Sequence, residues 1–165
     1  MALITKKDFG QVEPNHLSAQ RNGQIYAQLP CDESIKVLEN GMFVKYDYAR
    51  GACSFAADAV GEFMLVFNEV KLYDVKHSYK DFAYKVTDFT DGKMFPRVFK
   101  TMPGDLFTTN TFEADIELVV GDKLMVGTKG FLVKGTATAG QPSFQVAKVY
   151  TLADGQPAVK VQRIA

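Results

Sequence analysis

Short runs of alternating apolar and polar residues, separated by turn-forming residues, dominate this sequence. Val, Phe and Tyr are frequent within the runs, while Gly, Asp, Asn and Pro separate one run from the next. Alternation with a period of two places side chains on opposite faces of a β-strand, and the separating residues favour turns. No stretch has the apolar spacing of an amphipathic helix of convincing length. The sequence therefore predicts an all-β protein.

The first hundred residues contain strand-like segments of unequal character. Residues 24–29 form the first of them, and residues 41–49 follow the turn signal Asn40-Gly41. Residues 63–73 are apolar on both faces at their start. This pattern predicts a strand covered on both sides, and the most buried part of the chain.

Three neighbouring segments are less regular. Residues 50–62 are rich in small side chains, and the sequence leaves a short helix and an irregular loop equally open there. Residues 79–89 alternate well enough to predict a strand. Residues 93–100 contain Pro96, which a sheet tolerates only at an edge or a bulge.

Six short alternating segments make up the final third of the chain, and tight turns containing Gly connect several of them. Connections this short force neighbouring strands into hairpins or a meander. Many short strands imply closure or double layering, so we expect a small antiparallel β-barrel or sandwich. The segments are residues 105–112, 116–120, 122–128, 130–134, 144–152 and 157–164.

The 165 residues are enough for one domain of ordinary size or two small ones. Residues 1–22 are polar and lack sustained periodicity, which predicts either a frayed terminus or an extended arm that becomes ordered on a partner surface. We expect an N-terminal β lobe over residues 23–100 and a C-terminal β-barrel over residues 101–165. One continuous domain over residues 23–165 is the alternative.

Charge and composition exclude several classes of protein. Hydrophobic residues make up 47% and charged residues 23%, values of an ordinary soluble globular protein rather than a disordered one. The 19 Lys and Arg residues cancel the 19 Asp and Glu residues, which disfavours a nucleic-acid or anionic-membrane partner. No segment has the apolar length of a signal peptide or a membrane span, so we expect a protein made in the cytoplasm.

Few residues indicate chemistry. Cys31 and Cys53 lack the paired spacing of a zinc site or a redox dithiol, so we expect them to be reduced with one or both buried; a disulfide is the alternative. His16 and His77 fall in no metal or nucleophile pattern, and a pair of Cys53 with His77 is conceivable. We expect no catalytic, cofactor-binding or metal-binding residues.

Two surface patterns allow a plain and a functional interpretation. Glu113, Asp115 and Glu117 recur with a period of two, which predicts a solvated strand face that discourages aggregation; ion binding is the alternative. Aromatic residues alternate with Lys in residues 43–49 and 82–86. They favour packing inside a barrel, while a platform for base stacking is the alternative.

The turns of the final third also carry a resemblance to a known family. Residues 103–165 resemble the small β-barrel of the capsid decoration (cement) proteins of tailed bacteriophages. In that family a Gly-Asp enters a strand, a second Gly-Asp and a hairpin Gly follow, and an Asp-Gly precedes the last alternating strand. The matching residues here are Gly104-Asp105, Gly121-Asp122, Gly130 and Asp154-Gly155.

The resemblance implies a structural virion protein rather than an enzyme. Such a protein binds the outer surface of a phage head, reinforces contacts between subunits of the major capsid protein, and needs no cofactor. It implies a homo-oligomer, with a trimer favoured, located on the capsid surface of the virion. The alternatives are a small oligonucleotide- or saccharide-binding β-barrel module and a minor head-completion or tail protein.

If residues 1–22 dock on a capsid, their apolar and basic side chains are the expected contacts. Apolar residues would serve as anchors, and basic residues would contact acidic groups of the partner. The expected anchors are Leu3, Ile4 and Phe9, and the expected charge contacts are Lys6, Lys7 and Arg21.

Overall fold

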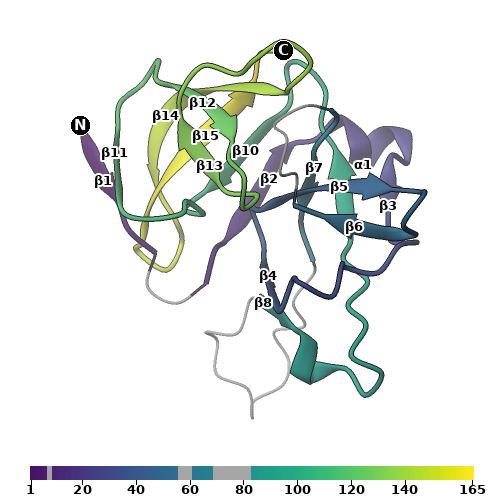
Figure 1. The fold of residues 1–165 in the computed structure, drawn as a ribbon. Coiled ribbons are helices and arrows are strands. Elements are labelled where there is room, and N and C mark those ends of the chain that lie inside the picture. Colours follow the sequence, from purple (N-terminus) through teal and green to yellow (C-terminus); the bar gives the residue numbers. More distant parts are fainter. Residues whose placement is uncertain (7–8, 56–60, 69–82) are drawn as a thin grey trace.

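The structure is a computed structural model that describes residues 1–6, 9–55, 61–68 and 83–165 (Figure 1). Strands account for 43% of it and helices for 6%, and all four sheets are antiparallel. The prediction of an all-β protein is therefore confirmed. Two larger sheets form the body of the molecule, and two short ribbons of two strands each accompany them.

The larger sheet has six strands in the order β13-β12-β14-β15-β10-β2. Five of them come from the alternating segments predicted in the final third of the chain, and the sixth comes from the N-terminal segment. The remaining predicted segment forms β11 (Ile116–Leu118), which pairs with β1 (Ala2–Ile4). The six strands are β2 (Val12–His16), β10 (Leu106–Thr109), β12 (Lys123–Val126), β13 (Leu132–Lys134), β14 (Ser143–Thr151) and β15 (Pro157–Arg163).

The second sheet has five strands in the order β3-β9-β7-β5-β6, all from residues 25–100. Its strands are β3 (Ile25–Tyr26), β5 (Phe43–Asp47), β6 (Ala52–Ser54), β7 (Met64–Val66) and β9 (Val98–Lys100). A ribbon of β4 (Val37–Glu39) and β8 (Ala83–Lys85) lies beside it, and a 3-10 turn (Val86–Asp88) follows β8.

The observed strands can be compared with the predictions for the less regular segments of the first hundred residues. For residues 50–62 the sequence leaves a short helix and an irregular loop open, and neither describes residues 52–54, which form the strand β6. Pro96 lies just before β9 and so takes no place in its ladder. Residues 69–73 of the expected strand 63–73 lie outside the described residues.

Two hydrophobic cores cover the two faces of the five-stranded sheet. On β5, Phe43 faces the first core and its neighbour Val44 faces the second. On β7, Leu65 faces the first core, while the residues on either side of it, Met64 and Val66, face the second. The first core is shared with the six-stranded sheet, so that β7 is covered on both sides as its sequence predicts.

Aromatic rings hold the two large sheets together in the first core. The ring of Phe43 lies 5.2 Å from that of Phe144 on β14 and 6.2 Å from that of Phe107 on β10. The rings are tilted or edge-on to one another, which is the favourable geometry for aromatic pairs. The two sheets therefore form one packed body.

The described part of residues 1–22 is not a free arm, which corrects the expectation from the sequence. β1 pairs with β11, and β2 is an edge strand of the six-stranded sheet beside β10. The helix α1 (Ser18–Asn22) follows. Ile4, Leu17 and Ala19 are at most 2% exposed and belong to the first core. Strands of three and five residues are too short to show sustained periodicity, so the pattern missed them.

Replacing Leu65 with Ala tests the doubly covered strand. Leu65 has no exposed surface, and deleting its side chain leaves a cavity between two sheets. We expect this substitution to lower the free energy of unfolding by about 2–5 kcal/mol, measured by chemical denaturation. The control is Val37→Ala, because Val37 is 41% exposed. A loss below about 1 kcal/mol for Leu65→Ala would contradict the packing described here.

Candidate functional site

The expected apolar contacts of the N-terminal segment divide between surface and core. Leu3 points outward from β1 and is 53% exposed. Its neighbour Ile4 points inward and is buried, so it cannot contact a partner. Phe9 is half-buried, and the ammonium group of Lys85 lies 5.1 Å from the centre of its ring. Of the three expected anchors, Leu3 is the most accessible.

The expected charge contacts divide in a similar way. The ammonium group of Lys6 donates a hydrogen bond of 2.5 Å to Oε2 of Glu39 and lies 5.0 Å from the ring centre of Phe131. The backbone N–H of Gly10 donates to the same oxygen at 2.6 Å, so Lys6 fastens the N-terminal segment to β4. Arg21 is exposed in the last turn of α1. Lys7 lies outside the described residues.

We call the exposed side chains on and next to the ribbon of β1 and β11 the N-terminal edge. Leu3 and Glu117 lie within the two strands, Met1 precedes β1, and Val120 lies two residues after β11. Met1 is 85%, Leu3 53% and Val120 62% exposed, and Leu3 stands opposite the exposed Glu117. The ribbon lies at one side of the molecule (Figure 1). Within the described residues, β1 pairs on one side only, so its other side is a strand edge.

The acidic row predicted on one face lies beside this edge. Asp115 and Glu117 are exposed, but only Glu117 lies on a strand, because β11 begins at Ile116, so the predicted strand face holds for Glu117 alone. Glu113 is also exposed, but its carboxylate accepts a hydrogen bond of 2.7 Å from the ammonium group of Lys129. In the part of the chain that the structure describes, no group of three or more His, Cys, Asp or Glu residues is arranged to hold a metal ion.

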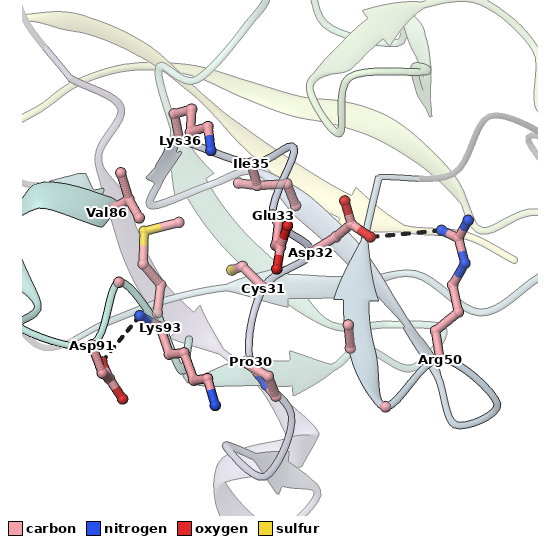
Figure 2. Close-up of a pocket in the computed structure, with 14 residues that line it drawn as sticks. Pro30, Cys31, Asp32, Glu33, Ile35, Lys36, Arg50, Val86, Asp91 and Lys93 are labelled. Carbon is pink, nitrogen blue, oxygen red and sulfur yellow. Dashed lines mark hydrogen bonds and ion pairs between the residues drawn. The ribbon is translucent and has the colours of Figure 1, made fainter.

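A cavity of about 740 Å³ lies next to the second core, whose residues Ile35 and Met94 line it. Figure 2 shows the side chains of the cavity wall. Its walls come from three stretches, residues 30–36, 50–52 and 86–94. Three acidic and three basic residues line it, so the cavity has no net charge. They are Asp32, Glu33 and Asp91, with Lys36, Arg50 and Lys93.

Asp32 orders the rim of this cavity. Its carboxylate accepts hydrogen bonds from the N–H and the hydroxyl of Ser34, at 3.0 and 2.6 Å, and Arg50 lies 3.7 Å away. The hydrogen bonds from Ser34 favour the ionised carboxylate and so lower the pKa of Asp32. The turn that precedes Ile35 is therefore held in one conformation.

The cavity wall also carries a pair of cysteines. Cys31 lines the cavity, and Cys53 lies buried on β6 with its Sγ 3.7 Å from that of Cys31. A parallel β-bridge joins the two residues, with the N–H of Cys53 bonded to the carbonyl of Pro30 and the N–H of Asp32 bonded to the carbonyl of Cys53. Both are free thiols, and one is buried, as the sequence predicts.

The thiols share their protons. The hydrogen bond between them lowers the pKa of Cys53, and the same bond together with burial raises the pKa of Cys31. The pair therefore gives up its first proton more readily than an isolated thiol and holds the second proton tightly. The spacing of the two cysteines contains no signal for this pairing, because the bridge depends on how the chain folds. His77 lies outside the described residues, so its conceivable pairing with Cys53 stays a prediction.

A second, smaller cavity of about 490 Å³ lies beside a tyrosine cluster that consists of Tyr26 on β3, Tyr46 on β5 and Tyr48 in the turn after β5. The rings of Tyr26 and Tyr46 are 5.8 Å apart, and those of Tyr46 and Tyr48 are 5.9 Å apart, both edge to face. Tyr48 is 77% exposed, and Lys45 and Lys100 line the same cavity. Of the aromatic residues in segment 43–49, Phe43 belongs to the first core, Tyr46 packs against the second core, and only Tyr48 faces solvent.

Comparisons with protein-family models, with curated proteins and with solved structures give no match. No helix among the described residues combines the length and the apolar composition needed to cross a membrane. The molecule is an all-β protein with three surface features. The N-terminal edge lies at the β1–β11 ribbon, and the cavity lined by Cys31 and the tyrosine cluster lie beside strands of the five-stranded sheet.

Proposed function

We propose that this protein is a structural virion protein that binds the outer surface of a phage head and reinforces contacts between subunits of the major capsid protein. The first support is the resemblance of residues 103–165 to capsid decoration proteins. The turns that carry this resemblance have defined roles here. The carboxylate of Asp122 accepts hydrogen bonds from the N–H of Val119 and from Lys134, and Gly130 has a left-handed φ of 79° against the carbonyl of Phe43.

The observation that carries the proposal is the N-terminal edge. Exposed apolar side chains next to a strand edge are a surface that proteins either protect or use for binding. Met1, Leu3 and Val120 give it apolar area, and Glu117 and Asp115 supply charge for the rim. A capsid subunit that adds a strand to β1 and buries Leu3 would use both the unpaired strand edge and the apolar side chains beside it.

The rest of the proposal concerns assembly. In it the protein is not an enzyme, it is made in the host cytoplasm, and it resides on the capsid surface of the virion. A homo-oligomer suits repeated binding, and a trimer is favoured because icosahedral shells present threefold positions. Several weak contacts made together then give tight attachment.

The tyrosine cluster supports a second candidate, a saccharide- or oligonucleotide-binding module. Exposed aromatic faces stack on sugars and bases, and Tyr48 with Tyr46 offers such a face beside Lys45 and Lys100. The net charge of zero gives no general attraction to a nucleic acid, so a saccharide is the ligand class that this cluster favours.

A binding titration to undecorated phage heads, read by sedimentation, tests both candidates. We expect the unchanged protein to cosediment with heads and Leu3→Lys to bind at least about tenfold more weakly, because a charge replaces the central apolar contact. Lys opposite Glu117 suits an exposed strand, so folding is preserved. Tyr48→Ala is the matched control, because Tyr48 is exposed and lies in the turn after β5, away from β1.

The two variants separate the candidates. Loss of binding by Leu3→Lys with Tyr48→Ala unchanged supports decoration through the N-terminal edge. Equal occupancy by Leu3→Lys and the unchanged protein would refute that edge as the contact. Failure of the unchanged protein to bind heads would refute the proposed function, and saccharide binding that Tyr48→Ala abolishes would establish the second candidate.

A further inference from the structure

The geometry of Cys31 and Cys53 suits formation of a covalent bond. Residues facing each other across a β-bridge have backbones about 4.8 Å apart, which is within the Cα separations of roughly 4.4–6.8 Å found for disulfides. The two Sγ atoms are 3.7 Å apart, while a disulfide needs about 2.05 Å. The remaining gap between the sulfurs is therefore one that side-chain rotation, rather than a shift of the bridged backbones, would have to close.

The surroundings of the pair give its two sulfurs different roles. Cys31 lines the cavity, so a small oxidant reaches its sulfur from solvent. Cys53 has no exposed surface and packs in the second core among Met64, Val66 and Met94. An oxidised Cys31 therefore meets Cys53 before it meets any external thiol.

We propose that Cys31 and Cys53 are an oxidisable dithiol that closes to an intramolecular disulfide when the protein passes from a reducing compartment to one that contains hydroperoxides. This inference is independent of the proposed function. It also fits any protein that is made in a reducing cytoplasm and later leaves it. The lowered pKa of Cys53 supports it, because the pair gives up its first proton more readily than an isolated thiol.

The chemistry is a two-electron oxidation in two steps. Loss of one proton leaves the other shared along the S–H···S hydrogen bond, and its transfer to Cys53 places the thiolate on Cys31, the sulfur that lines the cavity. This thiolate attacks one oxygen of hydrogen peroxide, the O–O bond breaks, and a sulfenic acid forms on Cys31, while the hydroxide that leaves takes the proton of Cys53 and becomes water. Cys53, now a thiolate, attacks the sulfenic sulfur of Cys31, the S–S bond forms, and the hydroxide displaced from that sulfur takes up the proton released at the start and leaves as a second water. In total, two thiols and one peroxide give one disulfide and two waters.

The bond would fasten the rim of the cavity to β6. Cys31 precedes the ordered turn at Asp32, and 22 positions separate the two cysteines along the chain. Closing a loop of this length restricts the unfolded chain and stabilises the folded one. We expect oxidation to raise the Tm by about 5–10 °C.

The experiment treats the full-length protein with hydrogen peroxide and follows it by intact mass, thiol titration and thermal unfolding. We expect a mass lower by two hydrogen atoms, loss of both thiols together, and the higher Tm. Digestion with trypsin under non-reducing conditions should link residues 22–36 to residues 51–71. A reducing agent should restore the original mass and Tm.

Cys31→Ser and Cys53→Ala are the controls, and each should lose the peroxide-dependent rise in Tm. Cys31→Ser is the safer of the two for folding, because residue 31 is only partly buried. Three outcomes would overturn the proposal: both thiols survive the treatment, the sulfurs go to sulfinic acids without a link, or disulfides form between molecules. A link without any change in Tm would refute the stabilising role.

Discussion

Deletion of residues 1–22 is expected to leave a chain that does not fold. The described part of this segment contributes an edge strand of the six-stranded sheet, one strand of the β1–β11 ribbon, and buried side chains of the first core. Ile4, Val12 and Leu17 each account for about 2–5 kcal/mol if lost. Their sum matches the whole stability of a typical domain, roughly 5–15 kcal/mol. Circular dichroism and cooperative unfolding of the purified fragment would measure this.

Two neighbouring residues of β1 provide the matched test. Ile4→Ala removes a buried side chain and should lower the free energy of unfolding by about 2–5 kcal/mol. Leu3→Ala changes an exposed side chain on the same strand and should stay within about 0.5 kcal/mol of the unchanged protein. A truncated protein that unfolds cooperatively at the original Tm would show that the segment is an arm after all.

Asp105→Ala is expected to have the second-largest effect, a loss of about 3–6 kcal/mol in the free energy of unfolding. The carboxylate has no exposed surface and accepts three hydrogen bonds, from the N–H and hydroxyl of Ser18 and from the N–H of Met102. Each buried donor left without a partner costs about 1–3 kcal/mol. Urea denaturation of the purified variant would measure the loss.

Asp105→Asn and Asp115→Ala complete this series. Asn keeps one carbonyl oxygen as an acceptor but replaces the other oxygen with a donor. The free energy of unfolding of Asp105→Asn should therefore lie between that of the unchanged protein and that of Asp105→Ala. Asp115 is exposed, so Asp115→Ala should change stability by less than about 0.5 kcal/mol. Equal stability of Asp105→Ala and Asp115→Ala would show that the hydrogen bonds from Ser18 and Met102 to Asp105 do not stabilise the fold.

The sequence predicts the strands wherever turns bracket an alternating run. All six segments of the final third contain a strand, because turn residues such as Gly and Asp separate most of these runs before the pattern drifts. The start of residues 63–73 is also predicted, because apolar residues on both faces have few other solutions than a strand between two cores.

The N-terminal segment and the candidate sites could not be predicted from local patterns. β1 and β2 are too short for periodicity, and their partners lie far along the chain. Leu3 and Ile4 look alike as apolar residues, and only the register of β1 separates the exposed one from the buried one. The bridge of Cys31 with Cys53 also depends on the fold, since it joins a loop to a strand.

The pairing of the N-terminal strands determines when the molecule can finish folding. Asn15 and Thr108, whose side chains are hydrogen-bonded at 2.7 Å, are separated by 93 positions. At synthesis rates of about 5–20 residues per second, β2 leaves the ribosome roughly 5–20 s before β10 exists. During this interval the strand has no native partner within its own chain. The six-stranded sheet therefore cannot assemble before β10 has been synthesised, and slower expression at lower temperature should raise the soluble yield, because it keeps fewer unfinished chains together at one time.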